Sequence, residues 1–297
     1  YFLHIHKAAL FLYHCIKLKE AKITNWKAPL CTSMHQMFRQ CSALTNLDLS
    51  GFEVSTTSGV DMSRCFQQCD NLKITGLSTM KVKPSNLNFA FTNITNTTIK
   101  NNFDFSTWDT SSCTNFGNMF EYSYSIETIN VSNWNMSSTT SLGGMFNMCS
   151  NLKHIRGLDT WDVSNCGNFS ALFADCKSLT DLSGVYNWDV SSATNLILMF
   201  KKCLSLKELD LRNWVTSGAT HSIEGMFYGC ENLEVLRVDN FDTSKLTHST
   251  SMGSIFYNCE KLKTLILNSF TNPGSLGNID DMFSGGSSLE YISMSDF

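Results

Sequence analysis

One pattern of apolar and polar positions recurs along the whole chain. It reads Met-Phe-x-x-Cys-x-x-Leu-x-x-Leu-x-Leu, with clear copies at 37–49 (MFRQCSALTNLDL), 199–211 (MFKKCLSLKELDL) and 226–238 (MFYGCENLEVLRV). Its aromatic anchors are Phe38, Phe66, Phe91, Phe120, Phe146, Phe173, Phe200, Phe227, Phe256 and Phe283, and Leu12 begins a further copy. The spacing is about 27 residues, which is typical of repeat architectures. Eleven such copies account for the 297 residues.

Each copy contains two halves with different periods. In residues 140–152 (TSLGGMFNMCSNL), the apolar residues recur every three or four positions from Leu142 onward, which predicts a short helix or a 3-10 turn. In residues 206–214 (LKELDLRNW), Leu209 and Leu211 alternate with polar residues as in a strand. Each copy therefore predicts one short helical segment followed by one strand.

Neither half of a copy can bury its apolar face alone, so the copies must stack side by side. Parallel strands of successive copies would then pair at about 4.8 Å, giving an array roughly 50 Å long. We predict one elongated α/β solenoid over 1–297, of about eleven coils, rather than two globular domains. A parallel sheet would form one face, and short helices or 3-10 turns would form the other.

The repeat resembles that of the BspA-type leucine-rich-repeat surface proteins. The resemblance rests on the repeated phrase together with a following Trp-Asp-x-Ser, seen at 108–111, 161–164 and 188–191. It implies a leucine-rich-repeat fold and a surface-exposed role in binding or adhesion. Three copies depart from the pattern, with NITNTTIKNN at 93–102, Ser123 in a cysteine position and Gly286 in another. We expect the copy at 92–104 to form a bulge or a loosened coil.

The twelve cysteines occupy apolar positions of the repeat. Eight of them lie three residues after an anchor: Cys15, Cys41, Cys69, Cys149, Cys176, Cys203, Cys230 and Cys259. Free cysteine behaves as a small buried hydrophobe, so this pattern predicts a ladder of mostly unbridged thiols. Disulfides between adjacent coils remain open on distance alone, although parallel side chains point the same way. The sequence has no Cys-x-x-Cys pair, which argues against zinc.

Two further repeat positions, next to each other in the sequence, hold an aromatic residue and then an aspartate. The aspartates Asp109, Asp162, Asp189 and Asp242 each lie two residues before a serine. This spacing is typical of Asx turns, and we favour that interpretation over a ladder of calcium sites. The accompanying Trp and Phe stripe is interpreted as core packing rather than a carbohydrate platform.

Composition excludes several functions. The formal charge is -4 and the pI is about 6.0, so the chain has no electrostatic attraction to nucleic acid or an anionic membrane. It contains no apolar run of about 18 residues that would predict a membrane span. Its histidines fall at unrelated repeat positions, and no phosphate loop or hydrolase motif occurs. We therefore predict no catalytic site, no metal and no cofactor.

A binding partner is expected on the strand face, where residues between the ladder leucines point outward. The candidate residues are Asn46, Asp48, Asn130, His154, Arg156, Asp181, Glu208, Asp210, Arg212, Arg237 and Asp239. One hypothesis is a cell-surface or extracellular protein that binds a protein or glycan through this face. The alternative is a structural spacer or decoration of an extracellular fibre, coat or virion, contacted by neighbouring chains at its ends. Both ends, 1–3 and 294–297, keep the repeat composition, so we expect further chain or neighbours to cover them.

Overall fold

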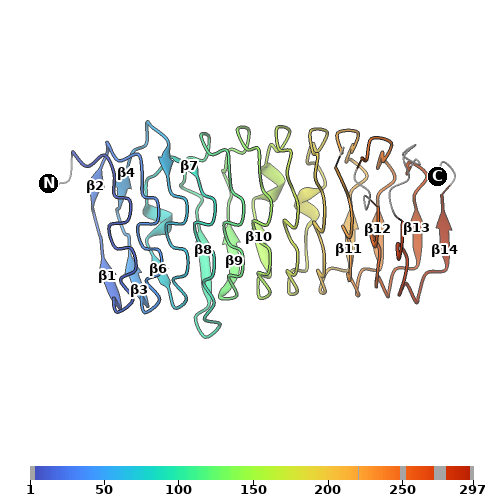
Figure 1. Cartoon of the computed structure of the whole chain (residues 1–297), viewed down its shortest axis with the longest axis horizontal. Coiled ribbons are helices and arrows are strands. Elements are labelled where there is room, and N and C mark those ends of the chain that lie inside the picture. The colour runs from blue at the N-terminus through green and yellow to red at the C-terminus, as the bar shows by residue number, and fades with distance from the viewer. Residues whose placement is uncertain (1–3, 220, 248–251, 271–278, 295–297) are drawn as a thin grey trace.

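The computed structural model describes residues 4–219, 221–247, 252–270 and 279–294. Residues 1–3 and 295–297, on which most of the expectation about the chain ends rests, lie outside the described residues. Figure 1 shows an elongated array of stacked coils with the two termini at opposite ends. The array makes about ten turns, close to the eleven expected, and the predicted solenoid is confirmed.

Short parallel strands form the main face of the array. They are β1 (Glu20–Lys22), β3 (Asn46–Asp48), β6 (Lys73–Thr75), β8 (Asn101–Asp104), β9 (Ile126–Asn130), β10 (His154–Arg156), β11 (Glu208–Asp210), β12 (Val235–Arg237), β13 (Thr264–Ile266) and β14 (Tyr291–Ser293). They form ladders in the order β1-β3-β6, β10-β9-β8, β11-β12 and β13-β14. The sheet is therefore interrupted rather than continuous along the described coils.

Two further rows of shorter pairs run along other sides of the coils. One row pairs β2 (Lys27–Ala28) with β4 (Glu53–Val54). The other row pairs β5 (Val60–Asp61) with β7 (Pro84–Asn86), and single bridges such as Asn168 to Asn195 continue it. Three 3-10 helices complete the secondary structure: η1 (Leu77–Thr79), η2 (Leu158–Thr160) and η3 (Ser183–Val185). None of the described helices is long and apolar enough to cross a membrane.

The helical half of the repeat forms single turns rather than a regular helix, so of the two predicted alternatives, a short helix or a 3-10 turn, the turn holds at segments such as 140–152. Around Phe146, alternate backbone N–H groups donate to the next coil: Gly144 to Ser170 at 2.7 Å, Phe146 to Leu172 at 3.0 Å and Met148 to Ala174 at 2.8 Å. The intervening N–H groups close turns within the coil instead. Because half of the donors serve the neighbouring coil, the i to i−4 bonds of an α-helix cannot form.

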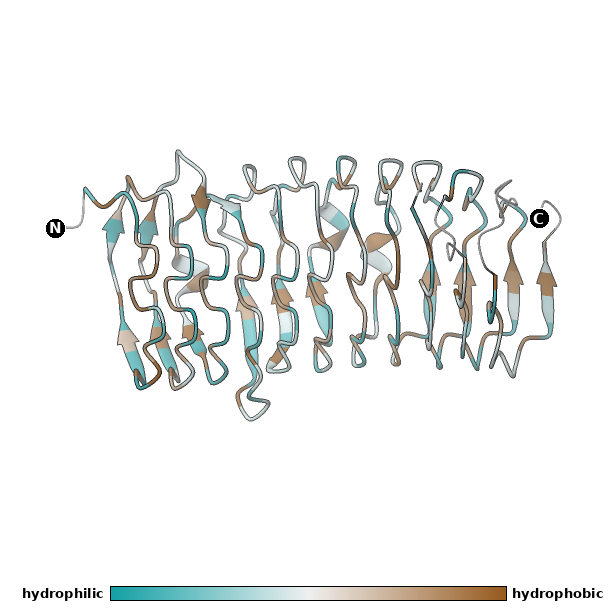
Figure 2. Cartoon of the chain, viewed as in Figure 1, coloured by the Kyte–Doolittle hydropathy of each residue, from teal (hydrophilic) through white to brown (hydrophobic). Residues whose placement is uncertain are grey.

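The apolar pattern of the repeat correctly predicts the core. Phe200, Cys203, Leu206, Leu209 and Leu211 are all buried, as expected. The anchor rings stack along the array, with centroids 5.7 Å apart for Phe146 and Phe173 and 5.8 Å apart for Phe173 and Phe200. Figure 2 shows apolar and polar residues alternating within the strands, so one side of each strand faces this core.

The irregular copy at 92–104 forms a bulge, as expected. The pairing of β8 with β9 shifts register between Asn101 and Asn102. Asn101 is buried, and its side-chain amide donates to the carbonyl of Leu72 at 3.1 Å and to the hydroxyl of Ser125 at 2.9 Å. These hydrogen bonds take the place of the apolar ladder contact that this copy lacks.

A Gly157→Ala substitution is expected to lower the free energy of unfolding by about 2–4 kcal/mol. Gly157 has φ of 97°, and an added Cβ would lie 2.5 Å from the backbone nitrogen of Ser132 in the neighbouring coil. Gly167→Ala is the matched control, because its Cβ would meet no atom closer than 3.6 Å. Urea denaturation of both variants tests this, and equal losses would contradict it.

Candidate binding surface

Two rows of outward side chains run along the strand face. In the β9–β10 ladder, His154 lies beside Thr128 and Arg156 beside Asn130. In the β11–β12 ladder, Asp210 lies beside Arg237. Ten of the eleven predicted residues lie on the strands of the main face or within two residues of the end of one. The exception is Asp181, which is treated below.

Several of the predicted polar residues are bonded to one another across coils. The Asn46 amide donates to the Glu20 carboxylate at 3.2 Å, and the Asn130 amide donates to the Asp104 carboxylate at 3.0 Å. Asp48 accepts the Ser50 N–H at 2.9 Å, and the Ser50 hydroxyl and N–H hold the pKa of Asp48 below its ordinary value. These residues therefore stabilise the sheet surface and its turns.

A charge cluster occupies the strand face at β11 and β12. The Arg212 guanidinium donates two hydrogen bonds to the Asp210 carboxylate, from Nη2 to Oδ2 at 2.8 Å and from Nε to Oδ1 at 3.0 Å. Arg237 Nη1 lies 3.9 Å from the same carboxylate. The hydrogen bonds from Arg212 are the main cause that lowers the pKa of Asp210. Bidentate pairing fixes the guanidinium plane, so the cluster is pre-organised.

The coil that carries Asp181 forms no strand, which corrects the expectation that Asp181 lies on a ladder. Figure 1 shows no arrow between β10 and β11. Among the described residues, no backbone hydrogen bond joins 180–182 to β10 or to β11. The 3-10 helix η3 begins at Ser183, where the strand would continue, and this coil therefore turns away before a ladder can form.

A groove of about 650 Å³ opens beside this strandless coil. Thr180, Asp181 and Tyr186 line it from the strandless coil, and Lys207, Glu208 and Arg237 line it from the coils that follow, with Asp210 beside them. The structure thus brings together four of the predicted residues, namely Asp181, Glu208, Asp210 and Arg237. Arg212 and Asp239 lie just after β11 and β12, His154 and Arg156 lie on β10, and Asn46, Asp48 and Asn130 lie on strands nearer the N-terminus.

The tyrosine and lysine of the groove were not predicted from the sequence. Tyr186 lies in the segment SGVYNW, where the leucine rhythm fails, and this failure was the available signal. Lys207 immediately precedes β11 and is exposed. The repeat pattern does not predict that Tyr186 or Lys207 lines a groove, because the pattern describes only the coils that form strands.

The aspartates of the Trp-Asp-x-Ser phrase form turns, as predicted. Asp109, Asp162, Asp189 and Asp242 each accept the backbone N–H of the serine two residues later, at 2.9 to 3.2 Å. Across the described ranges, no group of three or more His, Cys, Asp or Glu side chains is arranged to hold a metal ion. The indole N–H of Trp188 donates to the carbonyl of Leu158 at 2.8 Å, and its ring stacks on Trp161. The aromatic stripe is therefore core packing.

All twelve cysteines are free thiols, and eleven of them are buried. The ladder cysteines also have a role that the sequence analysis missed. Cys176 donates to the carbonyl of Phe146 at 3.0 Å, and Cys203 donates to that of Phe173 at 3.2 Å, each in the preceding coil. Ser123 replaces a cysteine and donates to the carbonyl of Phe91 at 2.6 Å. In these coils the position therefore holds a small side chain with a hydrogen-bond donor.

Serine, histidine and aspartate meet at one place near the N-terminal end. His35 Nδ1 lies 2.7 Å from the Ser63 hydroxyl, which donates to Asp61 Oδ1 at 2.7 Å. Because the serine proton goes to the carboxylate, the imidazole does not act as a base on this hydroxyl. Ser63 is also buried. This cluster is the Asx turn of that coil with a histidine bonded to it.

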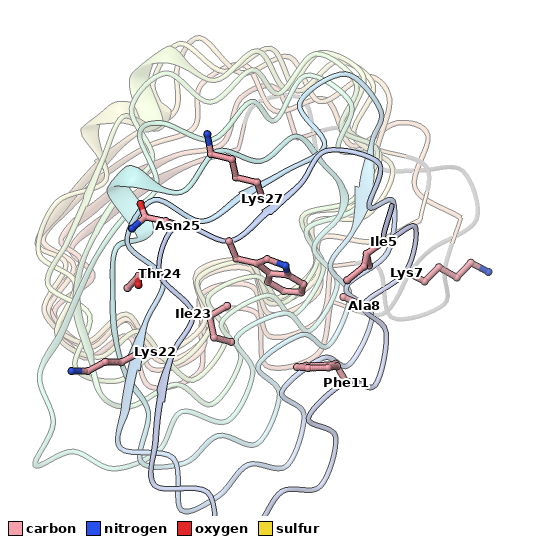
Figure 3. Close-up of a pocket in the computed structure, with 10 residues that line it drawn as sticks. Ile5, Lys7, Ala8, Phe11, Lys22, Ile23, Thr24, Asn25 and Lys27 are labelled. Atoms are coloured by element: carbon pink, nitrogen blue, oxygen red, sulfur yellow. The ribbon is translucent and has the colours of Figure 1, made fainter. Parts of the chain in front are cut away.

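A cavity of about 580 Å³ lies at the N-terminal end of the array. Figure 3 shows Phe11, Ile23 and Ala8 around it, with Lys22 and Lys27 on its rim. The Trp26 ring also lines it and packs edge-on against Phe52, with centroids 4.9 Å apart. This cavity is the inward side of the first coil, so it belongs to the core of the solenoid.

The stacked coils, the ladder leucines and the polar strand face define a leucine-rich-repeat solenoid. The chain belongs to the family described as "Mycoplasma protein of unknown function, DUF285", whose model matches residues 4–102, 60–178, 85–214, 148–266 and 221–296. No curated protein matches the chain.

Several solved leucine-rich-repeat structures are similar to this chain. A leucine-rich repeat protein from Bacteroides ovatus is 18% identical, with a TM-score of 0.48 over 93% of this chain and 69% of that one. A leucine rich cell surface protein from Faecalibacterium prausnitzii is 11% identical, with a TM-score of 0.35 over 95% and 82%. A leucine-rich repeat protein from Eubacterium ventriosum is 16% identical, with a TM-score of 0.35 over 92% and 82%.

Proposed function

We propose that this chain is a non-enzymatic, BspA-type surface or secreted protein that binds a protein or glycan partner through its strand face. The observation that carries the proposal is the cluster of Asp210, Arg212 and Arg237 beside the groove. Its side chains are fixed before binding, so association costs little side-chain entropy. The surface location rests on the resemblance of the repeated phrase to BspA-type proteins.

The alternative function is a structural spacer in an extracellular assembly, contacted through its coil ends. One observation favours it: Phe11 is 64% exposed beside the Trp26 ring at the N-terminal cavity, with ring centroids 6.3 Å apart. A large exposed aromatic residue next to a core cavity is a suitable contact for another chain. The two functions differ in the face that their partners contact.

Replacing Arg212 or Arg237 with alanine is expected to weaken partner binding by about 1–3 kcal/mol each. The two losses should not add, because both guanidinium groups contact Asp210. The measurement is adhesion of protein-coated beads to a panel of immobilised extracellular matrix proteins and mucins, with affinities then taken by surface plasmon resonance.

Arg64→Ala is the matched control, since Arg64 lies on the opposite, turn-forming half of the repeat over the Phe89 ring. It removes the same charge without touching the strand face. Equal losses for Arg64→Ala and Arg237→Ala would reject the strand face as the contact surface. Binding abolished by Phe11→Ser, but unaffected by both arginine variants, would support the spacer function instead.

A further inference from the structure

We propose that the groove beside the strandless coil binds a neutral oligosaccharide. The proposal rests on the proposed function and names the chemical class of ligand that the strand face recognises. It starts from the volume of the groove, about 650 Å³, which falls in the range of sites that hold a small organic ligand. Two to three linked hexose rings are of this order of size.

Both kinds of hydrogen-bonding group line the groove. Among the described residues, the Glu208 carboxylate has no hydrogen bond or ion pair, and Asp181 uses only one oxygen, Oδ1, to accept the Ser183 N–H. Lys207 likewise makes no ion pair within that part of the chain. Carboxylates only accept and ammonium groups only donate, whereas each sugar hydroxyl does both. A polyhydroxylated ligand therefore satisfies all of these groups at once.

The backbone of the strandless coil adds further polar groups. Thr180 and Asp181 are exposed and share no ladder hydrogen bond with the flanking strands in the described structure. Main-chain N–H and C=O groups that lack a ladder partner need water or a ligand. Hydroxyl groups along an oligosaccharide can replace that water.

Tyr186 supplies the apolar contact that a sugar ring needs. Its side chain is half-buried in the groove and stacks on no other ring among the described residues. The C–H face of a hexose is apolar, so it packs against an aromatic ring while the hydroxyls at its rim reach polar side chains. The coil that holds Tyr186 is fixed by the buried indole of Trp188, which donates to Leu158.

The charges of the groove favour a neutral ligand over a charged one. Three carboxylates, Asp181, Glu208 and Asp210, lie near two basic groups, Lys207 and Arg237. The near balance gives no strong attraction to a basic peptide, and the free carboxylates repel an acidic sugar. Neutral hexoses avoid both penalties.

The test uses the whole chain and a panel of defined probes, namely lacto-N-tetraose, cellotetraose, maltotetraose and sialyllactose, with affinities measured by isothermal titration calorimetry. We expect at least one neutral tetrasaccharide to bind and sialyllactose to bind more weakly. Tyr186→Ala and Glu208→Gln should each weaken that binding about tenfold or more. Tyr186→Phe should retain most of it, because the ring remains.

Glu20→Gln is the matched control, because Glu20 opens β1 on the same face as Glu208 opens β11. It should leave the affinity unchanged. No binding of any neutral probe, or equal effects of Glu20→Gln and Glu208→Gln, would overturn the inference. If matrix proteins stripped of their glycans still bind in a manner that depends on Arg212 and Arg237, only the oligosaccharide inference fails. If binding to these matrix proteins does not depend on Arg212 and Arg237, the proposed function itself is rejected.

Discussion

Raising the pH from 8 to 10 is expected to unfold this protein. Burial is the main cause that raises the pKa of the Cys113, Cys166 and Cys259 thiols from 9.0 to about 12, and six further buried cysteines are shifted in the same direction. In the unfolded chain these thiols ionise from pH 9, whereas in the folded chain they keep their protons. The stabilisation is therefore complete below pH 9 and is lost as the pH rises from 9 towards 12.

The magnitude follows from linkage. One pH unit above the unfolded pKa, each such thiol lowers the free energy of unfolding by about 1.4 kcal/mol. The hydrogen bond between Cys41 and Cys69 shifts the pKa values of these two thiols in opposite directions, so the pair is left out of the sum. The other eight thiols together then remove on the order of 10 kcal/mol, comparable to the whole stability of a typical domain. Urea denaturation in the presence of reductant at pH 8, 9 and 10, followed by circular dichroism, measures the loss.

A Cys203→Ala variant separates this effect from other alkaline titrations. At pH 8 the variant should be less stable than the wild type by about 1 kcal/mol, because a small cavity replaces the thiol. At pH 10 the difference should vanish or reverse, since the wild type alone keeps a proton on Cys203 only in its folded state. A difference that stays constant between the two pH values would contradict the burial argument.

Phe173→Ala should be the most damaging single core substitution in the middle of the array. The ring is fully buried and stacks on Phe146 and Phe200, so its loss is expected to cost about 3–5 kcal/mol. Because each coil contacts only its neighbours, the damage should also uncouple the two halves of the array. Chemical denaturation should then show two transitions in place of one.

Hydrogen exchange locates the break that this variant creates. Amides in the coils around Phe173 should exchange faster, while those near Phe66 and Phe256 keep most of their protection. Phe11→Ala is the control, because this exposed ring lies outside the stack of anchors and should change stability little. A single transition with the midpoint of the wild type would show that the anchor stack does not couple the coils.

The core and the strands were predictable because every copy repeats the same apolar positions. Leu206, Leu209 and Leu211 lie where the pattern placed them. The turn segments do not form regular helices, and the reason is physical. Their N–H groups bond to the next coil, and residues such as Leu198 and Lys202 adopt left-handed φ of 56° and 52°. Neither residue type favours that conformation, so the neighbouring coil imposes it.

The candidate surface was predictable only in part, and the reason is similar. Glu208, Asp210 and Arg237 follow from alternation along strands. Asp181 was assigned to a strand that does not form, because the 3-10 helix η3 begins at Ser183, where the strand would continue. Tyr186 lines the groove because no strand forms in its coil, so its position depends on how the whole coil packs. The spacing of apolar residues along the sequence does not predict how a whole coil packs.

The strandless coil also bears on how such a protein can change over generations. Its neighbours, β10 and β11, belong to separate ladders, so nothing in the sheet requires the residues on one side to suit those on the other. Unequal crossover between similar copies in the gene could insert or delete a whole coil before the strandless coil or beyond β12. The groove would then move closer to or farther from either end of the array without being rebuilt. A single irregular coil thus lets the length of the array vary independently of the groove.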